Sequence, residues 1–252
     1  MTTSGRAPTV HLVGAGPGGV GSLTRRAARL LGQADLVVLD RPSLDRIADL
    51  APAAAERVHV GRRPGHAAWT TSEVVALLVD RARTGLRVVR LKGGDPFVCS
   101  RGAEEALALA DAGITVDVTP GVTAMTVAGG TSGLARGTSN TVASGNHDPA
   151  GPAVDWGAIG AVDGRQGSIV VLTGRSHQGT VADSLVAGGW SSATSAAVVH
   201  GAGRTDESVS ASTLATVGTV RLAPPAAMVV APSRPGGCPS PRHRPGGERA
   251  HP

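Results

Sequence analysis

The sequence is poor in aromatic and thiol side chains. Of its 252 residues one is phenylalanine, three are tryptophan, none is tyrosine and two are cysteine. Two cysteines are too few for a disulfide framework or a thiolate metal site, and the eight histidines form no HExxH pair. Proteins that bind single-stranded nucleic acid stack bases on aromatic side chains, which are scarce here. We therefore expect no metal and no nucleic-acid partner.

Long apolar runs are also missing. No stretch of about eighteen apolar residues is present, and the N-terminal segment lacks the basic and apolar regions of a secretory signal. A cytoplasmic protein without a membrane partner is therefore expected. Lysine and arginine number 24 against 19 acidic residues, a net charge of +5. A modest basic cleft for an acidic small molecule fits this surplus.

Short apolar segments alternate with helical patterns along the chain. Such segments are typical of strands that are covered on both faces, so the alternation predicts an α/β fold with mainly parallel sheets. Strands are expected at residues 9–13, 36–39, 87–91, 114–118, 168–172, 196–200 and 226–231. Helices are expected at residues 22–31, 43–50, 72–83, 103–112 and 180–187, three of which begin with a serine that can cap a helix.

Proline and glycine interrupt the chain in TPGVTA, residues 119–124, after the fourth expected strand. We therefore expect an N-terminal α/β domain at residues 1–121 and a C-terminal one at residues 122–231. Residues 232–252 lack apolar periodicity and are dense in proline, glycine and arginine. Such a composition buries too little surface to offset the entropy of ordering, so it predicts a disordered tail.

The first glycine-rich segment is VGAGPGG, between the first expected strand and helix. Gly14, Gly16 and Gly19 satisfy GxGxxG, and Asp40 ends the second strand about where a ribose-binding acid would stand. This pattern is consistent with a dinucleotide site. A tight turn that needs glycines only for its geometry, or a site for another ligand, explains it as well.

A second glycine-rich segment, RLKGGDPFVCSRG, lies at the end of the third expected strand and contains the only lysine of the chain, Lys92. Gly93 and Gly94 would let a ligand approach the main chain, and Asp95 offers a charge or a helix cap. An ordinary turn is the alternative interpretation. Two such loops after strands indicate a ligand-binding cleft.

The segments VHLVGAGPG, ADLVVLDR, ERVHVGRRPG, RVVRLKGGDPFV and AGITVDVTPGVTA occur in a characteristic order. With them the sequence resembles the uroporphyrinogen-III C-methyltransferases of the tetrapyrrole methylase family, over roughly residues 9–231. The resemblance implies a homodimer of subunits with two α/β domains, with S-adenosylmethionine in the cleft between the domains.

The activity that the resemblance implies is transfer of two methyl groups to carbons 2 and 7 of the tetrapyrrole uroporphyrinogen III. The products are precorrin-2 and two molecules of S-adenosylhomocysteine, on the way to sirohaem or cobalamin. Three alternatives stay open: a related precorrin methyltransferase, a relative that binds ligands without turnover, and a dinucleotide-binding oxidoreductase.

The resemblance also implies roles for individual residues. Asp40 would be the catalytic proton acceptor, although an aspartate that ends a strand is often a cap or a solvated charge. Arg101 and Arg136 would bind substrate carboxylates through paired hydrogen bonds, with structural ion pairs as the alternative. The residues expected to bind cofactor are Pro17, Gly93, Gly94, Asp95, Val98, Thr123, Ala124, Thr173 and Ala202.

Several positions depart from the family pattern. Arg62 stands where a lysine is usual as the proposed catalytic proton donor, and a guanidinium with a pKa above about 12 is a poor acid at neutral pH. Leu134 and Ala135 replace a threonine and a histidine. The other departures are Thr173 for methionine, Ala202 for glycine, Cys99 for phenylalanine and Ser100 for glycine. These departures do not change the predicted fold, but they affect positions at which we expect substrate, cofactor or catalytic contacts.

Overall fold

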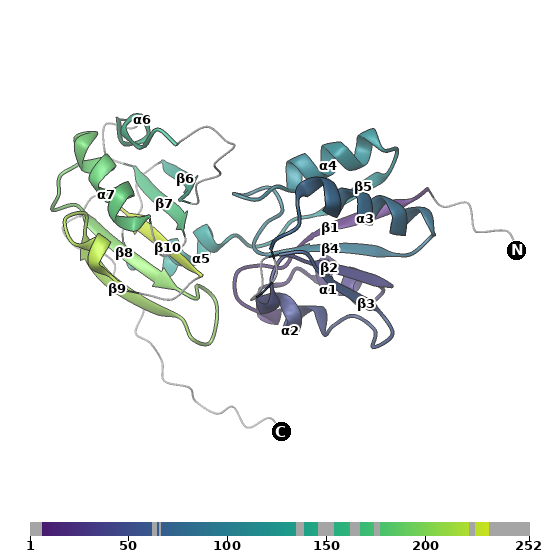
Figure 1. Ribbon diagram of the computed structural model, residues 1–252. Coiled ribbons are helices and arrows are strands. Elements are labelled where there is room, and N and C mark those ends of the chain that lie inside the picture. The colour runs from purple at the N-terminus through teal and green to yellow at the C-terminus, as the bar shows by residue number, and fades with distance from the viewer. Residues whose placement is uncertain are drawn as a thin grey trace, which may run out of the picture. The chain divides into compact units, whose positions relative to one another are not determined.

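The computed structural model describes residues 7–61, 65, 67–134, 139–145, 154–161, 167–173, 177–221 and 225–231. They form two compact units, each with a five-stranded sheet (Figure 1). The first unit holds the described residues up to Ala124 together with Gly203–Thr205, and the second holds the rest. The predicted boundary after residue 121 lies just before this division, and the predicted tail, 232–252, lies outside the described residues.

The first sheet is parallel throughout and has the strand order β3-β2-β4-β1-β5. In this order β4 lies between β1 and β2 (Figure 1). Because the strands are parallel, the loops that follow them leave the sheet at one edge, where ligands bind in open α/β sheets. The strands are β1 (Thr9–Gly14), β2 (Leu36–Leu39), β3 (Glu56–His59), β4 (Val88–Lys92) and β5 (Thr115–Thr119).

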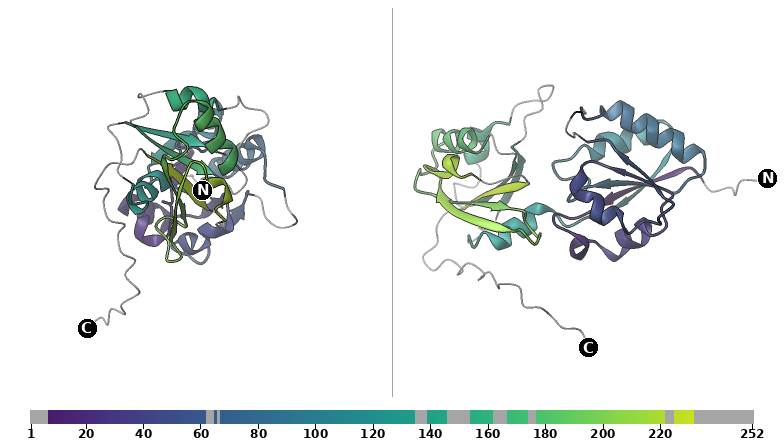
Figure 2. Two further views of the ribbon diagram at one scale, coloured as in Figure 1. Left: turned by 90° about the vertical axis from the view of Figure 1, so that its left-hand side faces the viewer. Right: turned by 60° about the horizontal axis from the view of Figure 1, so that its bottom comes forward.

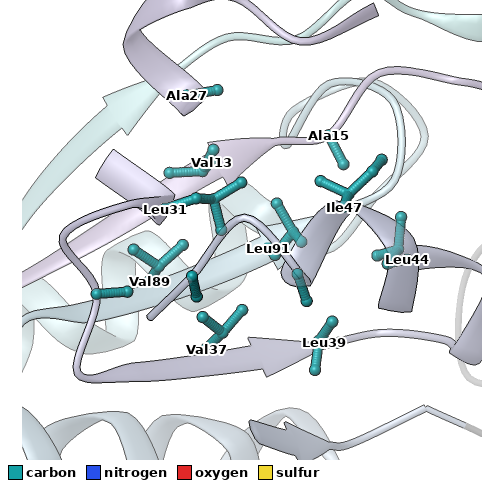
Figure 3. Packing of buried hydrophobic residues seen from close by; sticks show 13 residues of the cluster. Val13, Ala15, Ala27, Leu31, Val37, Leu39, Leu44, Ile47, Val89 and Leu91 are labelled. Atoms are coloured by element: carbon teal, nitrogen blue, oxygen red, sulfur yellow. The ribbon is translucent and has the colours of Figure 1, made fainter. Parts of the chain in front are cut away.

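Helices cover both faces of the first sheet (Figure 2). Side chains of successive strand residues point to opposite faces. Val37 and Leu39 therefore pack with α1 and α2 (Figure 3). Leu36 and Val38 pack with α3 and α4 on the other face. The helical elements are η1 (Val20–Ser22), α1 (Arg25–Leu31), η2 (Pro42–Leu44), α2 (Asp45–Ala48), α3 (Thr71–Arg83) and α4 (Gly102–Asp111).

The helix caps differ from the prediction. Thr24 caps α1 by accepting a hydrogen bond from the amide of Ala27 at 3.1 Å. Thr70 and Glu73 form a reciprocal capping box at the start of α3. The three serines predicted as caps were assigned wrongly, because they lie inside helical elements: Ser22, Ser43 and Ser72. The cap is the hydroxyl residue whose backbone is still extended, which Thr24 and Thr70 satisfy.

The second sheet has the order β6-β7-β10-β8-β9. It consists of β6 (Asn140–Ser144), β7 (Ser168–Thr173), β8 (Ser195–His200), β9 (Ser208–Thr213) and β10 (Ala226–Val230). The pair β6 and β7 is parallel, and the other three described pairs are antiparallel. The α/β class and the parallel first sheet are thus confirmed. The second sheet is mixed, because β10 lies antiparallel between β7 and β8, and β9 lies antiparallel to β8.

Helices also cover the second sheet on both faces. One face packs with α6 (Trp156–Ala161), α7 (Gln178–Ala187) and η4 (Val217–Thr219). The other face packs with α5 (Ala124–Thr131). Among the residues that the structure describes, no helix has the length and apolar content needed to cross a membrane.

Candidate functional site

The end of β1 and the segments that follow β1, β4 and β5 meet at four glycines, here called the glycine junction: Gly14, Gly16, Gly94 and Gly121. The amide of Gly16 donates a hydrogen bond to the carbonyl oxygen of Gly94 at 3.1 Å. The amide of Gly94 donates one to the carbonyl oxygen of Gly16 at 2.9 Å. A Cβ atom on Gly14 would lie 2.5 Å from the nitrogen of Gly121, and one on Gly121 would clash with the Gly94 carbonyl oxygen. Close packing of three loops therefore requires glycine at both positions.

Gly94 combines a special conformation with open space. Its φ is 69°, in the left-handed region that favours glycine, and no heavy atom of the described chain lies within 4 Å of the place a Cβ would occupy. The adjacent Gly93 is different, because the guanidinium of Arg41 covers its Cβ position. Gly94 thus offers bare main chain against which a ligand can lie.

Asp95 fixes this loop through both carboxylate oxygens. Its Oδ1 accepts a hydrogen bond from the amide of Phe97 at 2.9 Å, and its Oδ2 accepts one from the amide of Gly121 at 3.1 Å. The carboxylate therefore ties the loop after β4 to the segment after β5. A direct contact of Asp95 with cofactor stays a prediction, whereas its role in holding the loop is visible in these bonds.

Four charged side chains form a cluster beside the loop, here called the charged cluster: Asp40, Arg90, Lys92 and Glu105. Arg90, Lys92 and Glu105 are buried, with exposed fractions of 2%, 3% and 3%. Glu105 of α4 accepts hydrogen bonds from Arg90 Nε at 3.0 Å, Arg90 Nη2 at 2.9 Å and Lys92 Nζ at 2.8 Å. The burial of these charges is therefore compensated by pairing.

Arg90 also reaches Asp40, which directly follows β2. Its Nη2 donates to Asp40 Oδ1 at 2.5 Å. Burial alone would lower the pKa of Arg90, but the charge of Asp40 and the hydrogen bonds and charge of Glu105 outweigh it and raise the pKa above its usual value. The Asp40 side chain is 31% exposed, and its Oδ2 makes no hydrogen bond with any described residue. One oxygen is thus fixed and the other remains available.

The other residues predicted from the sequence are distributed over both units. Pro17 follows Gly16 of the junction, and Val98 follows the loop fixed by Asp95. Arg101 is exposed at the start of α4, and its Nη1 lies 3.4 Å from Thr71 Oγ1. Thr123 and Ala124 lie two and three residues after Gly121 of the junction. Thr173 ends β7 and Ala202 is buried against α5 in the second unit, whereas Arg62, Ala135 and Arg136 lie outside the described residues.

Sequence reasoning missed Gly121, Glu105 and the pairing of Arg90. One signal was present: Arg90 and Lys92 are charged residues in a strand expected to be covered on both faces, and a buried charge requires a partner. Glu105 could not be chosen as that partner from the sequence, since Glu104 stands beside it on the same helix.

The geometry does not favour a dinucleotide site. In such a site the glycine-rich turn leads directly into a helix whose N-terminus binds the pyrophosphate. Here the Gly16 amide already donates to Gly94, and α1 begins only at Arg25. The part of the chain that the structure describes also contains no group of three or more metal-binding side chains.

Comparison with known proteins supplies the family. The family of Tetrapyrrole (Corrin/Porphyrin) Methylases matches residues 9–218. Siroheme synthase 1 of Yersinia pseudotuberculosis is 39% identical over 227 residues, 88% of this chain and 48% of that protein. Siroheme synthase of Chromobacterium violaceum is 38% identical over 200 residues, 77% of this chain and 42% of that protein. The chain thus spans about half the length of the curated relatives it matches.

Solved structures agree with this assignment. The native uroporphyrin-III C-methyltransferase of Thermus thermophilus is 34% identical with a TM-score of 0.76, covering 88% of this chain and 97% of that one. The same Thermus protein complexed with S-adenyl homocysteine matches equally well. A cobalt precorrin-4 methyltransferase, at 22% identity and a TM-score of 0.75, shares the fold. The family resemblance of the sequence is confirmed, and the chain belongs to the tetrapyrrole methylases.

Proposed function

We propose that this protein is a uroporphyrinogen-III C-methyltransferase. It transfers two methyl groups from S-adenosylmethionine to carbons 2 and 7 of uroporphyrinogen III, giving precorrin-2 and two molecules of S-adenosylhomocysteine. The observation that carries the proposal is the loop after β4, which Asp95 and the glycine junction fix while the main chain at Gly94 stays open. The identity to the Thermus methyltransferase, whose complex contains S-adenyl homocysteine, supports it.

The open side of Gly94 fits the cofactor, because a Cβ there would occupy the space in which a ligand can lie against the backbone. S-adenosylmethionine supplies a methyl group on a positively charged sulfur. Gly94 would contact it through the main chain, with Pro17, Thr123 and Ala124 close by in sequence to the glycine junction. The further proposed contacts are Gly93, Val98, Thr173 and Ala202.

Asp40 provides a proton acceptor for this chemistry. Methylation of a pyrrole carbon shifts charge through the macrocycle, and a positioned base assists the accompanying proton loss. The Oδ2 of Asp40, which makes no hydrogen bond with any residue that the structure describes, can accept that proton, while its Oδ1 stays paired with Arg90. Arg62 would pair with a substrate carboxylate more readily than donate a proton, because its guanidinium is a very weak acid.

Arginine side chains suit the substrate, which carries eight carboxylates. Arg101 is exposed where α4 begins, four positions before the buried Glu105, so its backbone is anchored while its side chain can reach a ligand. A guanidinium can bind a carboxylate through two parallel hydrogen bonds. Arg136 is proposed for the same task. We further propose that the protein is a cytoplasmic homodimer whose product feeds sirohaem, the compound named in the curated relatives.

The test is anaerobic incubation of the purified protein with uroporphyrinogen III and S-adenosylmethionine, followed by mass spectrometry. A product heavier by two methyl groups is expected, and none without S-adenosylmethionine. Calorimetry with S-adenosylhomocysteine and NAD should give binding of the first alone. Tight binding of S-adenosylhomocysteine without methyl transfer would replace this proposal by a relative that binds ligand without turnover. Binding of NAD alone would overturn both.

A further inference from the structure

We propose that Arg90 is a positioning residue that orients the Asp40 carboxylate, and that Glu105 holds Arg90 in the orientation this requires. This inference rests on the proposed function, in which Asp40 accepts a proton. It adds to that function a buried pair of residues that would touch neither substrate nor cofactor.

Strand register brings Arg90 to Asp40. Arg90 of β4 stands opposite Val38 of β2, and Asp40 is two residues farther along. Residues two apart on an extended chain share a face, so the Asp40 side chain and the Arg90 guanidinium lie on the same side. Since β4 is next to β2 in the sheet, Arg90 needs no further element to reach Asp40.

All three guanidinium nitrogens of Arg90 have acceptors. Nε and Nη2 donate to the two oxygens of Glu105, Nη1 lies 3.4 Å from the Val38 carbonyl oxygen, and Nη2 also donates to Asp40. A planar guanidinium held at each nitrogen can hardly rotate. The direction of its bond to Asp40 Oδ1 is therefore fixed by β2 and α4 together.

A fixed Oδ1 also limits where Oδ2 can lie. Proton transfer requires the accepting oxygen to lie within hydrogen-bond distance of the group that loses the proton. A small displacement of that oxygen lowers the reaction rate strongly. An exposed aspartate without a buried partner would sample several side-chain rotamers. Arg90 restricts that sampling while leaving Oδ2 without a bond to any described residue.

The charges of the cluster allow Arg90 to be removed without stranding a buried ion. In Arg90→Met, Glu105 keeps Lys92 as its partner, and Asp40 is exposed enough to be hydrated. Glu105→Gln would instead leave Arg90 and Lys92 buried with a single carboxylate, which is more destabilising. Arg90→Met is therefore the informative change, because methionine retains most of the buried volume.

Arg87→Met is a matched control. Arg87 pairs with Asp35 at 3.0 Å just before β4 and β2 begin, whereas Arg90, in the middle of β4, pairs with Asp40 just after β2 ends. The same substitution thus removes an arginine–aspartate pair between the same two strands, away from the glycine junction. It should leave methyl transfer unchanged.

The experiment measures kcat and KM of methyl transfer for the wild type, Arg90→Met, Asp40→Asn and the double variant. Asp40→Asn alone should lower kcat on the order of a hundredfold. Arg90→Met should lower kcat by about tenfold or more with little change in KM for S-adenosylmethionine. When Arg90→Met is added to Asp40→Asn, kcat should fall by less than about a further twofold. The two losses are then not additive, because Arg90 acts on the reaction through Asp40. Fully additive losses would overturn the proposal.

Crystal structures with S-adenosylhomocysteine bound separate this inference from the proposed function. Asp40 should occupy one rotamer in the wild type and several, or another, in Arg90→Met. An unchanged single rotamer would refute positioning even if activity fell. Should the wild type add no methyl group, the proposed function fails, and the Asp40 rotamers still decide on positioning. If Arg90→Met does not fold, Arg90→Lys serves, since an ammonium cannot bridge both carboxylates with the same fork.

Discussion

Gly14, the last residue of β1, lies so close to Gly121 that a Cβ atom on Gly14 would stand 2.5 Å from the Gly121 nitrogen. Gly121 in turn donates its amide hydrogen to Asp95 of the loop after β4. The ends of three strands are therefore locked together by backbone contacts and one carboxylate. This arrangement explains how a loop with open space beside Gly94 can still hold a defined shape.

The first prediction concerns this contact. Gly14→Ala should destabilise the protein by about 1–3 kcal/mol, since the added methyl group meets backbone atoms that cannot easily move. Thermal unfolding should show a fall of several degrees. Gly21→Ala is the control, because no heavy atom of the described residues, its two chain neighbours aside, lies within 4 Å of its Cβ position. Equal melting temperatures for the two variants would contradict the close packing.

The second prediction concerns ligand binding at Gly94. Gly94→Ala should weaken S-adenosylhomocysteine binding at least tenfold, about 1.4 kcal/mol, because a methyl group would fill the open space beside the loop. Gly85→Ala is a matched control at the other end of β4, with a φ of 85° and the same open surroundings. Both variants bear similar backbone strain, so isothermal calorimetry isolates the effect on the ligand. Equal affinities would remove Gly94 from the cofactor site.

The third prediction concerns the start of α3. Thr70→Ala should lower the free energy of unfolding by about 1 kcal/mol. The change removes the hydrogen bond that Thr70 Oγ1 accepts from the Glu73 amide and the one that it donates to Glu73 Oε2. Ser72→Ala should be nearly neutral, since Ser72 lies within the helix and is not its cap. Chemical denaturation of both variants gives the comparison. A larger loss for Ser72→Ala would restore the serine cap that the sequence suggested.

The fourth prediction concerns pH. Burial would raise the pKa of Asp117, but hydrogen bonds and charges from Arg26 and His11 outweigh it and hold the pKa below its ordinary value. The carboxylate therefore stabilises the fold above its unfolded pKa of about 3.9, and this contribution is lost as the pH falls through the lower folded value.

Asp117→Asn should accordingly lower the melting temperature by a few degrees at pH 7, and the difference from the wild type should shrink as the pH falls from about 5 toward 3. Asp111→Asn removes the same charge from an exposed position at the end of α4 and should have little effect at either pH. A difference for Asp117→Asn that grows in acid would show that the ion pair is not its source.

Much of the first unit could be predicted from local sequence. The run LVVL forms β2 with the predicted bounds, because four successive apolar residues suit a strand covered on both faces. β3, β6 and β9 were missed, since they are edge strands with few buried residues and little apolar signal. α5 was missed as well, because adjacent glycines lie inside it.

For the candidate site, the sequence by itself determined which loops can approach a ligand. Gly93, Gly94 and Asp95 follow an apolar strand, and this is a local property that one segment carries. The tertiary structure decided which groups these loops meet. Arg90 meets Asp40 because β4 lies next to β2, and Arg90 and Lys92 share Glu105 because α4 packs over that face of the sheet. Apolar periodicity reports how each segment is buried, whereas strand order depends on the free energy of all segments packed together.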